Sequence, residues 1–206
     1  MYIYAFGSVC RGEIDTSSDV DLLAILDNAE HGFDPLIYSI YSYCRLQELW
    51  VQGNPFAWHL HLESKLIYTL DGSDPVAKLG SPAKYTNAVA DCEKFYAIFL
   101  KAKEEILSSS FSEVFELSNI FLSMRNFATC YSLQYCREPV FSRDSSIQIG
   151  LNSLDIQEDI YDIYRRARML CTRGIGVQLT DIEISEAKSC MDYIDEWMKY
   201  TLAGVS

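Results

Sequence analysis

The order of apolar and polar residues predicts a chain in two parts, with strands in the first part and helices in the second. Two short apolar runs, Tyr2–Phe6 and Val20–Leu26, are rich in aromatic, β-branched and leucine residues and have Gly, Ser, Thr and Asp between them. Runs of this length and composition are typical of buried strands. We therefore expect two neighbouring strands joined by a polar segment.

Three further elements are predicted before residue 84. Residues 34–35, Asp-Pro, combine an N-cap residue with proline at the first helical position, and apolar residues then recur at helical spacing over 36–50. Apolar and polar residues alternate over 56–63, which predicts a strand. Residues 66–68 predict a short edge strand, and a turn-rich connector follows it.

Beyond Tyr85 the apolar period is helical throughout. A capping box, Thr180 with Glu183, opens the last predicted helix. We read these apolar stripes as the core of a bundle. The predicted fold class is α+β, with a small mixed-sheet domain at 1–84 followed by an all-α helical bundle at 85–206. The helical stripes cover residues 95–106, 114–135, 156–170 and 184–198.

The net charge and the cysteine content indicate which binding partners and which cellular compartment to expect. The formal net charge of −12 argues against a grip on nucleic acid and favours cationic partners. The seven cysteines are scattered and never spaced C-x-x-C, which is typical of reduced thiols in a cytoplasmic protein. No apolar run approaches the roughly twenty residues that span a bilayer, and we expect neither a membrane segment nor a secretory signal.

Candidate chemistry lies between the first two predicted strands. Gly7-Ser8 directly follows the first strand, where a residue without a Cβ lets backbone N–H groups approach an anion, and a helix opening behind it would attract phosphate. Asp19 and Asp21 lie at the start of the second strand. Residues i and i+2 of a strand point to the same face, so these carboxylates are expected side by side. Such an oxygen pair suits Mg²⁺ with a bound triphosphate.

Taken together, these residues resemble the DNA polymerase β nucleotidyltransferase superfamily, which includes minimal nucleotidyltransferases and aminoglycoside adenylyltransferases. The resemblance rests on Gly7-Ser8, Arg11-Gly12 and Ser18-Asp19-x-Asp21-Leu22. It implies a mixed-sheet nucleotidyltransferase core that transfers a nucleoside monophosphate, with ATP as the first candidate donor, to a hydroxyl group. It also implies Mg²⁺ or Mn²⁺ on Asp19 and Asp21, and nucleotide binding by Gly7, Ser8, Arg11 and Ser18.

The third predicted strand, residues 56–63, is where this sequence departs from the superfamily. Members usually carry an Asp or Glu in the middle of that strand, as general base or metal ligand, whereas this sequence has His59 and His61 there and Glu63 at the end. We expect Glu63 to serve as the third ligand, with His61 beside it. Loss of the central acid favours the alternative, a regulatory pseudo-enzyme that binds nucleotide.

The second predicted helix carries another resemblance. Arg125-Asn126 with Cys130 resembles the Arg-Asn-x-x-x-His signature of HEPN domains, but the cysteine replaces the histidine, which implies a form without nuclease activity. The region also resembles the helical domain of aminoglycoside adenylyltransferases. Arg125 and Arg143 are then expected to contact triphosphate.

The acceptor stays open between two classes. A cationic small molecule fits the acidic charge, and a protein side chain fits an antitoxin-like role. Many members of the superfamily carry a helix before the first strand, which covers one face of the sheet. In this chain we expect that cover from the C-terminal region or from the second subunit of a homodimer.

Overall fold

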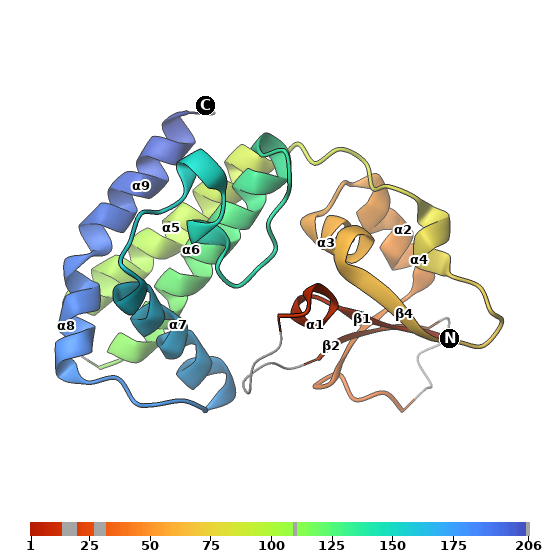
Figure 1. Cartoon of the computed structure of the whole chain (residues 1–206), viewed down its shortest axis with the longest axis horizontal. Coiled ribbons are helices and arrows are strands. Elements are labelled where there is room, and N and C mark those ends of the chain that lie inside the picture. Colours follow the sequence, from red (N-terminus) through yellow and green to blue (C-terminus); the bar gives the residue numbers. More distant parts are fainter. Residues whose placement is uncertain (14–19, 27–31, 109–110, 205–206) are drawn as a thin grey trace. The chain divides into compact units, whose positions relative to one another are not determined.

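A computed structural model of the chain describes residues 1–13, 20–26, 32–108 and 111–204. The chain divides into two compact units, Met1–Thr86 and Asn87–Ser206, within two residues of the predicted boundary. The first unit contains both strands and helices, and the second is helical in its described part (Figure 1). The fold is therefore mixed α and β.

The described part of the first unit contains a four-stranded mixed sheet in the order β3-β2-β1-β4. β1 is antiparallel to both β2 and β4, whereas β2 and β3 are parallel. The predicted first two strands and the edge strand are confirmed. The strands are β1 (Tyr2–Phe6), β2 (Asp21–Ile25), β3 (Tyr38–Tyr41) and β4 (Ser64–Thr69).

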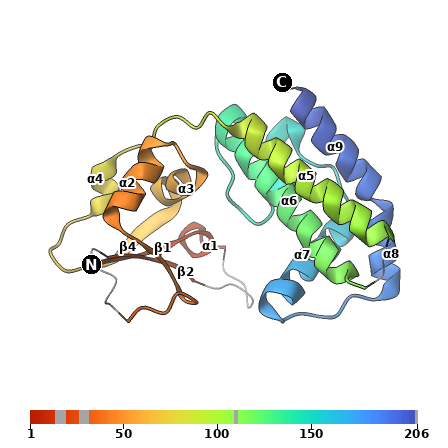
Figure 2. The same ribbon diagram turned by 180° about the vertical axis from the view of Figure 1, so that it is seen from behind.

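Helices cover one face of this sheet and form the core with it. Alternate strand residues such as Tyr4 and Leu23 meet Leu46, Trp50 and Leu60 from the helices, and all five side chains are buried. Both views show α2, α3 and α4 on the same side of the sheet (Figures 1 and 2). The helices are α1 (Ser8–Arg11), α2 (Tyr43–Val51), α3 (Pro55–Glu63) and α4 (Pro75–Leu79).

The helix predicted over 36–50 is wrong in its first half. Asp34 closes a turn instead: its backbone oxygen accepts hydrogen bonds from the N–H groups of Ile37 and Tyr38 at 3.0 and 2.9 Å. The aromatic and β-branched run that follows pairs with β2 as strand β3. The helix begins only at Tyr43, where the side chain of Ser42 accepts a hydrogen bond from the N–H group of Arg45.

The strand predicted over 56–63 is also wrong, because the segment forms helix α3. Asn54 caps it by accepting a hydrogen bond from the N–H group of Phe56 at 2.9 Å, and Pro55 occupies the first turn. Ala57 and Leu60 are completely buried. Alternation misled the prediction because this helix is apolar on several sides, so the local start signal of 54–55 carried the better information.

The second unit confirms the predicted helices and the capping box of Thr180 and Glu183. Its last predicted helix is divided at Cys190, because the two halves pack on different partners. α8 packs on α7, where the Tyr164 hydroxyl donates to the Ala187 carbonyl at 2.7 Å. α9 packs on α5. The helices are α5 (Ala88–Ser108), α6 (Glu113–Tyr135), α7 (Glu158–Arg173), α8 (Asp181–Ser189) and α9 (Met191–Ala203), with short 3-10 turns at Ser145–Ile147 and Gly150–Asn152.

A buried carboxylate joins α5 to α9 in this unit. Asp195 accepts hydrogen bonds from the Tyr96 hydroxyl at 2.7 Å and from the Lys103 ammonium group at 2.9 Å, and Lys199 lies 3.1 Å away. Burial alone would raise the pKa of Asp195, but these donors outweigh burial and hold the pKa below its ordinary value. The side chain is thus a satisfied structural ion.

Candidate functional site

Gly7 forms the sharp turn at the end of β1. Its φ of 75° and ψ of −143° lie in a region that is essentially restricted to glycine. Its carbonyl accepts hydrogen bonds from the N–H groups of Cys10 and Arg11, which begins α1. A Cβ atom on Gly7 would lie only 2.8 Å from Oδ2 of Asp21. Glycine is therefore required both by the backbone and by the neighbouring carboxylate.

The strand register explains why Asp21 lies beside this turn. Asp21 is the first residue of β2 and pairs with Phe6, the last residue of β1. Its side chain is therefore on the same side of the sheet as Phe6, next to Gly7. Asp19 and Ser18 lie outside the described residues, so the predicted carboxylate pair stays a prediction.

Helix α1 differs from the expected phosphate-binding helix in its length. It has four residues and ends at Gly12, which is left-handed with φ 79°. A single turn carries little of a helix dipole. The anion-binding capacity near Ser8 therefore depends on the first backbone N–H groups, which have no partner within a helix.

A triad of polar side chains from α1 and α3 lies next to the turn. Glu63 forms an ion pair with Arg11, whose guanidinium also lies 2.8 Å from Glu13, and Oε2 of Glu63 is 3.0 Å from Nε2 of His59. The three side chains of the triad, Arg11, His59 and Glu63, are less than one-fifth exposed. Burial alone would raise the pKa of Glu63, but the His59 hydrogen bond and the Arg11 charge outweigh burial and hold the pKa below its ordinary value. Glu63 is therefore an ionised carboxylate held by two partners.

His59 connects this triad to the turn. Its ring packs edge-on against Phe6 with centroids 5.5 Å apart. Its Cε1 atom lies 3.9 Å from the position of a Cβ on Gly7, the same position that is 2.8 Å from Asp21. We call Gly7, Asp21 and His59 the Gly7 corner.

The structure separates His61 from the residues with which it was expected to lie. In a helix, residues i and i+4 share a face, so His59 and Glu63 meet whereas His61 does not. Nε2 of His61 is 3.3 Å from the hydroxyl oxygen of Ser81, and its ring packs edge-on against Trp58. His59, which the strand interpretation left aside, takes the place predicted for His61. The i, i+4 spacing of His59 and Glu63 after an Asn-Pro start was the signal that could have found it.

Among the described residues, no group of three or more His, Cys, Asp or Glu side chains could hold a metal ion. Glu63 is engaged by Arg11 and His59. The described carboxylate that lies beside Gly7 is that of Asp21. An oxygen pair of Asp21 with Asp19 would fit Mg²⁺, and the predicted role of Glu63 as a third metal ligand does not fit its ion pair.

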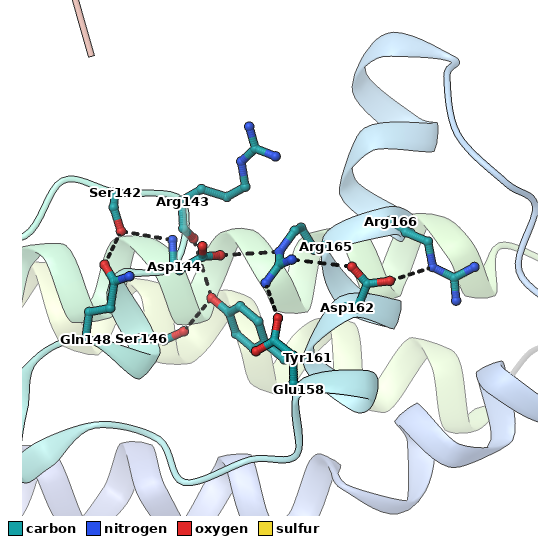
Figure 3. Close-up of polar contacts among 10 residues, drawn as sticks. All are labelled: Ser142, Arg143, Asp144, Ser146, Gln148, Glu158, Tyr161, Asp162, Arg165 and Arg166. Carbon is teal, nitrogen blue, oxygen red and sulfur yellow. Dashed lines mark hydrogen bonds and ion pairs between the residues drawn. The ribbon is translucent and has the colours of Figure 1, made fainter. Parts of the chain in front are cut away.

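Arg125 and Arg143 belong to the second unit, on α6 and on the loop that follows it. This loop is anchored by Ser145, whose hydroxyl donates to the Arg125 carbonyl at 2.8 Å. Figure 3 shows the guanidinium of Arg143 pointing away from the polar network around Asp144 and Arg165. Their predicted contact with triphosphate stays a prediction. Cys130, at the histidine position of the HEPN signature, is buried.

The polar network in Figure 3 is held together by ion pairs of Arg165. Arg165 lies 3.3 Å from Asp144, 2.9 Å from Glu158 and 3.4 Å from Asp162. It also stacks over Tyr161, with the guanidinium carbon 5.3 Å from the ring centroid. These contacts join the loop after α6 to α7.

Comparison of the chain with protein-family models and with curated proteins finds no match. Among the described residues, no helix combines the length and apolar character needed to cross a bilayer.

Proposed function

We propose that the chain is a Mg²⁺-dependent nucleotidyltransferase that transfers a nucleoside monophosphate, AMP in the first instance, from a nucleoside triphosphate to a hydroxyl group. The observation that carries the proposal is the approach of Asp21 to Gly7 at the end of β1. This geometry brings the backbone of a glycine turn and a carboxylate together in one place, as a metal–triphosphate complex requires.

In this proposal each residue of the Gly7 corner has a role. The backbone of Gly7 and Ser8 receives the β- and γ-phosphates, and Asp21 with Asp19 holds Mg²⁺. When bound, the metal supplies positive charge that stabilises the negative charge developing on the phosphates. Because Gly7 has no side chain, the phosphates can approach the turn closely.

Transfer requires one bond to form and one to break. The acceptor oxygen bonds to the α-phosphorus, the bond from that phosphorus to the bridging oxygen breaks, and pyrophosphate leaves. His59 is the base that we assign to the hydroxyl proton, since it is the histidine beside Gly7. Glu63 positions the His59 ring, and Arg11 holds Glu63.

A second candidate function is regulatory nucleotide binding without transfer. The observation that favours it is the ion pair of Glu63 with Arg11, which occupies the carboxylate that contacts His59 of the corner. Such a protein would act through a bound partner, as in an antitoxin-like module. The two functions share nucleotide binding and differ in chemistry.

Labelled nucleotides separate these candidates. We expect α-³²P from ATP, GTP, CTP or UTP, with Mg²⁺, to move to a hydroxyl compound or to a protein in a cell extract. Label from γ-³²P should appear only in pyrophosphate. Transfer of the γ-label would indicate a kinase, and nucleotide binding with no transfer of either label would support the regulatory function.

A further inference from the structure

Arg11 lies between two carboxylates and contacts both. Its Nη1 donates to Glu63, and its Nε and Nη2 lie 2.9 and 2.8 Å from Oε2 of Glu13. All three nitrogens of the guanidinium group are therefore engaged by carboxylates. Burial alone would lower the pKa of Arg11, but the hydrogen bond with Glu13 and the charges of both acids outweigh burial and raise it.

These two carboxylates make Arg11 a poor ligand for triphosphate. A phosphate oxygen would have to displace a carboxylate from the guanidinium group or approach it past two negative charges. Glu13 is 52% exposed and readily solvated, whereas Glu63 is only 14% exposed. Moving Arg11 away from Glu63 would leave a largely buried charge without its cation, so this is the costly contact to break.

Glu63 determines which ring nitrogen of His59 carries the proton. The pKa of Glu63 is held below its ordinary value, so the carboxylate is ionised and can only accept hydrogen bonds. Nε2 of His59, which lies 3.0 Å from Oε2 of Glu63, must then be the donor. A neutral imidazole carries its proton on one nitrogen, so the lone pair that can accept a proton is on Nδ1.

Packing fixes the same ring from another direction. Phe6 packs edge-on against His59 and against Phe56, with centroids 5.5 and 5.7 Å apart. Cε1 of His59, which is bonded to both ring nitrogens, lies 3.9 Å from the position of a Cβ on Gly7. The ring is thus oriented by Glu63 at Nε2 and by Phe6 through packing, with Cε1 beside the Gly7 turn.

We infer that Arg11 is a positioning residue that acts on His59 through Glu63, and that Nδ1 of His59 takes the proton of the acceptor hydroxyl. The inference rests on the proposed function and deepens it. As the acceptor oxygen bonds to the α-phosphorus and pyrophosphate leaves, the hydroxyl proton moves to Nδ1. Nε2 keeps its proton and its hydrogen bond, and the ionised Glu63 stabilises the imidazolium that forms.

The first test is Arg11→Met, which keeps an unbranched side chain and removes the charge. Affinity for α,β-methylene-ATP with Mg²⁺ should stay within twofold of the wild type, whereas α-label transfer from ATP in a cell extract should slow at least tenfold. Arg45→Met, which removes an exposed pair with Glu48 on α2, should change neither quantity. Unchanged transfer, or a loss of nucleotide affinity as large as the loss of transfer, would overturn the positioning role.

Combined variants test whether Arg11 acts through Glu63. In the Glu63→Gln protein, Arg11→Met should slow transfer less than twofold further, because the carboxylate that Arg11 positions has already gone. Equal losses in the wild-type and Glu63→Gln backgrounds would contradict an action through Glu63.

NMR of protein labelled with ¹⁵N-histidine tests the nitrogen assignment independently of activity. The His59 signals are assigned by their loss in His59→Gln. In the neutral ring of the wild type the proton should be on Nε2, and Glu63→Leu should add a population with the proton on Nδ1. A wild-type ring protonated on Nδ1, or an unchanged single tautomer in Glu63→Leu, would overturn the assignment alone. A wild-type protein that binds no nucleotide would overturn the proposed function and this inference together.

Discussion

Replacing Asp21 with asparagine is expected to abolish the rise in melting temperature that ATP with Mg²⁺ gives the wild-type protein. A ligand that binds only the folded state stabilises it, and the amide removes the charge that holds the metal. Transfer should fall at least about a hundredfold, because the metal contributes several kcal/mol of charge stabilisation. Differential scanning fluorimetry with and without MgATP, and the α-label assay, measure the two effects.

The matched control for Asp21→Asn is Glu48→Gln on α2, which makes the same change in net charge at an exposed ion pair with Arg45. Exposed pairs of this kind contribute about 0–1 kcal/mol. Glu48→Gln should keep the full shift with MgATP. An unchanged shift in Asp21→Asn would place the nucleotide away from the Gly7 corner.

Gly7→Ala is expected to remove nucleotide binding and to lower stability by about 1–3 kcal/mol from backbone strain alone. The added Cβ would also lie 2.8 Å from Oδ2 of Asp21, so the carboxylate must move. The thermal shift with MgATP measures the loss of nucleotide binding, and urea unfolding measures the loss of stability.

Gly12→Ala is the control that separates strain from contact. Gly12 has a similar positive φ of 79°, but a Cβ there would meet nothing within 4 Å. It should cost about 1–2 kcal/mol, the usual penalty for a left-handed residue, with the nucleotide shift retained. Equal loss of the shift in both variants would show that Asp21 is not displaced by the Gly7 side chain.

The strands β1, β2 and β4 and the helices of the second unit were predictable because their signals are local and agree with one another. Tyr2–Phe6 is short, apolar and closed by glycine, and Thr180 with Glu183 defines a helix start on its own. The two wrong elements arose where signals conflicted. Over 36–41 the Asp34-Pro35 turn resembled a helix start, and over 56–63 alternation outweighed the cap at Asn54. Over 36–41 pairing with β2 decided the outcome, whereas over 56–63 the local cap at Asn54 did.

The candidate site was only partly predictable for the same reason. The neighbourhood of Gly7 and Asp21 follows from a simple antiparallel register, which the sequence order of two strands already implies. The triad of Arg11, His59 and Glu63 does not, because it depends on the face that α3 turns toward β1. Because residues 56–63 form a helix and not the predicted strand, His59 lies in the candidate site and His61 lies away from it.

The most direct test of the central claim, a metal–nucleotide site at the Gly7 corner, is paramagnetic broadening by Mn²⁺ in the amide NMR spectrum with α,β-methylene-ATP bound. The opposite ends of β1 and β2, at Tyr2 and Ile25, provide an internal reference roughly 13 Å along the same strands. We predict the strongest broadening at Ser8, Asp21 and Leu22 and much weaker broadening at Tyr2 and Ile25. Broadening that is strongest at the Tyr2 end, or centred in the second unit, would contradict the account.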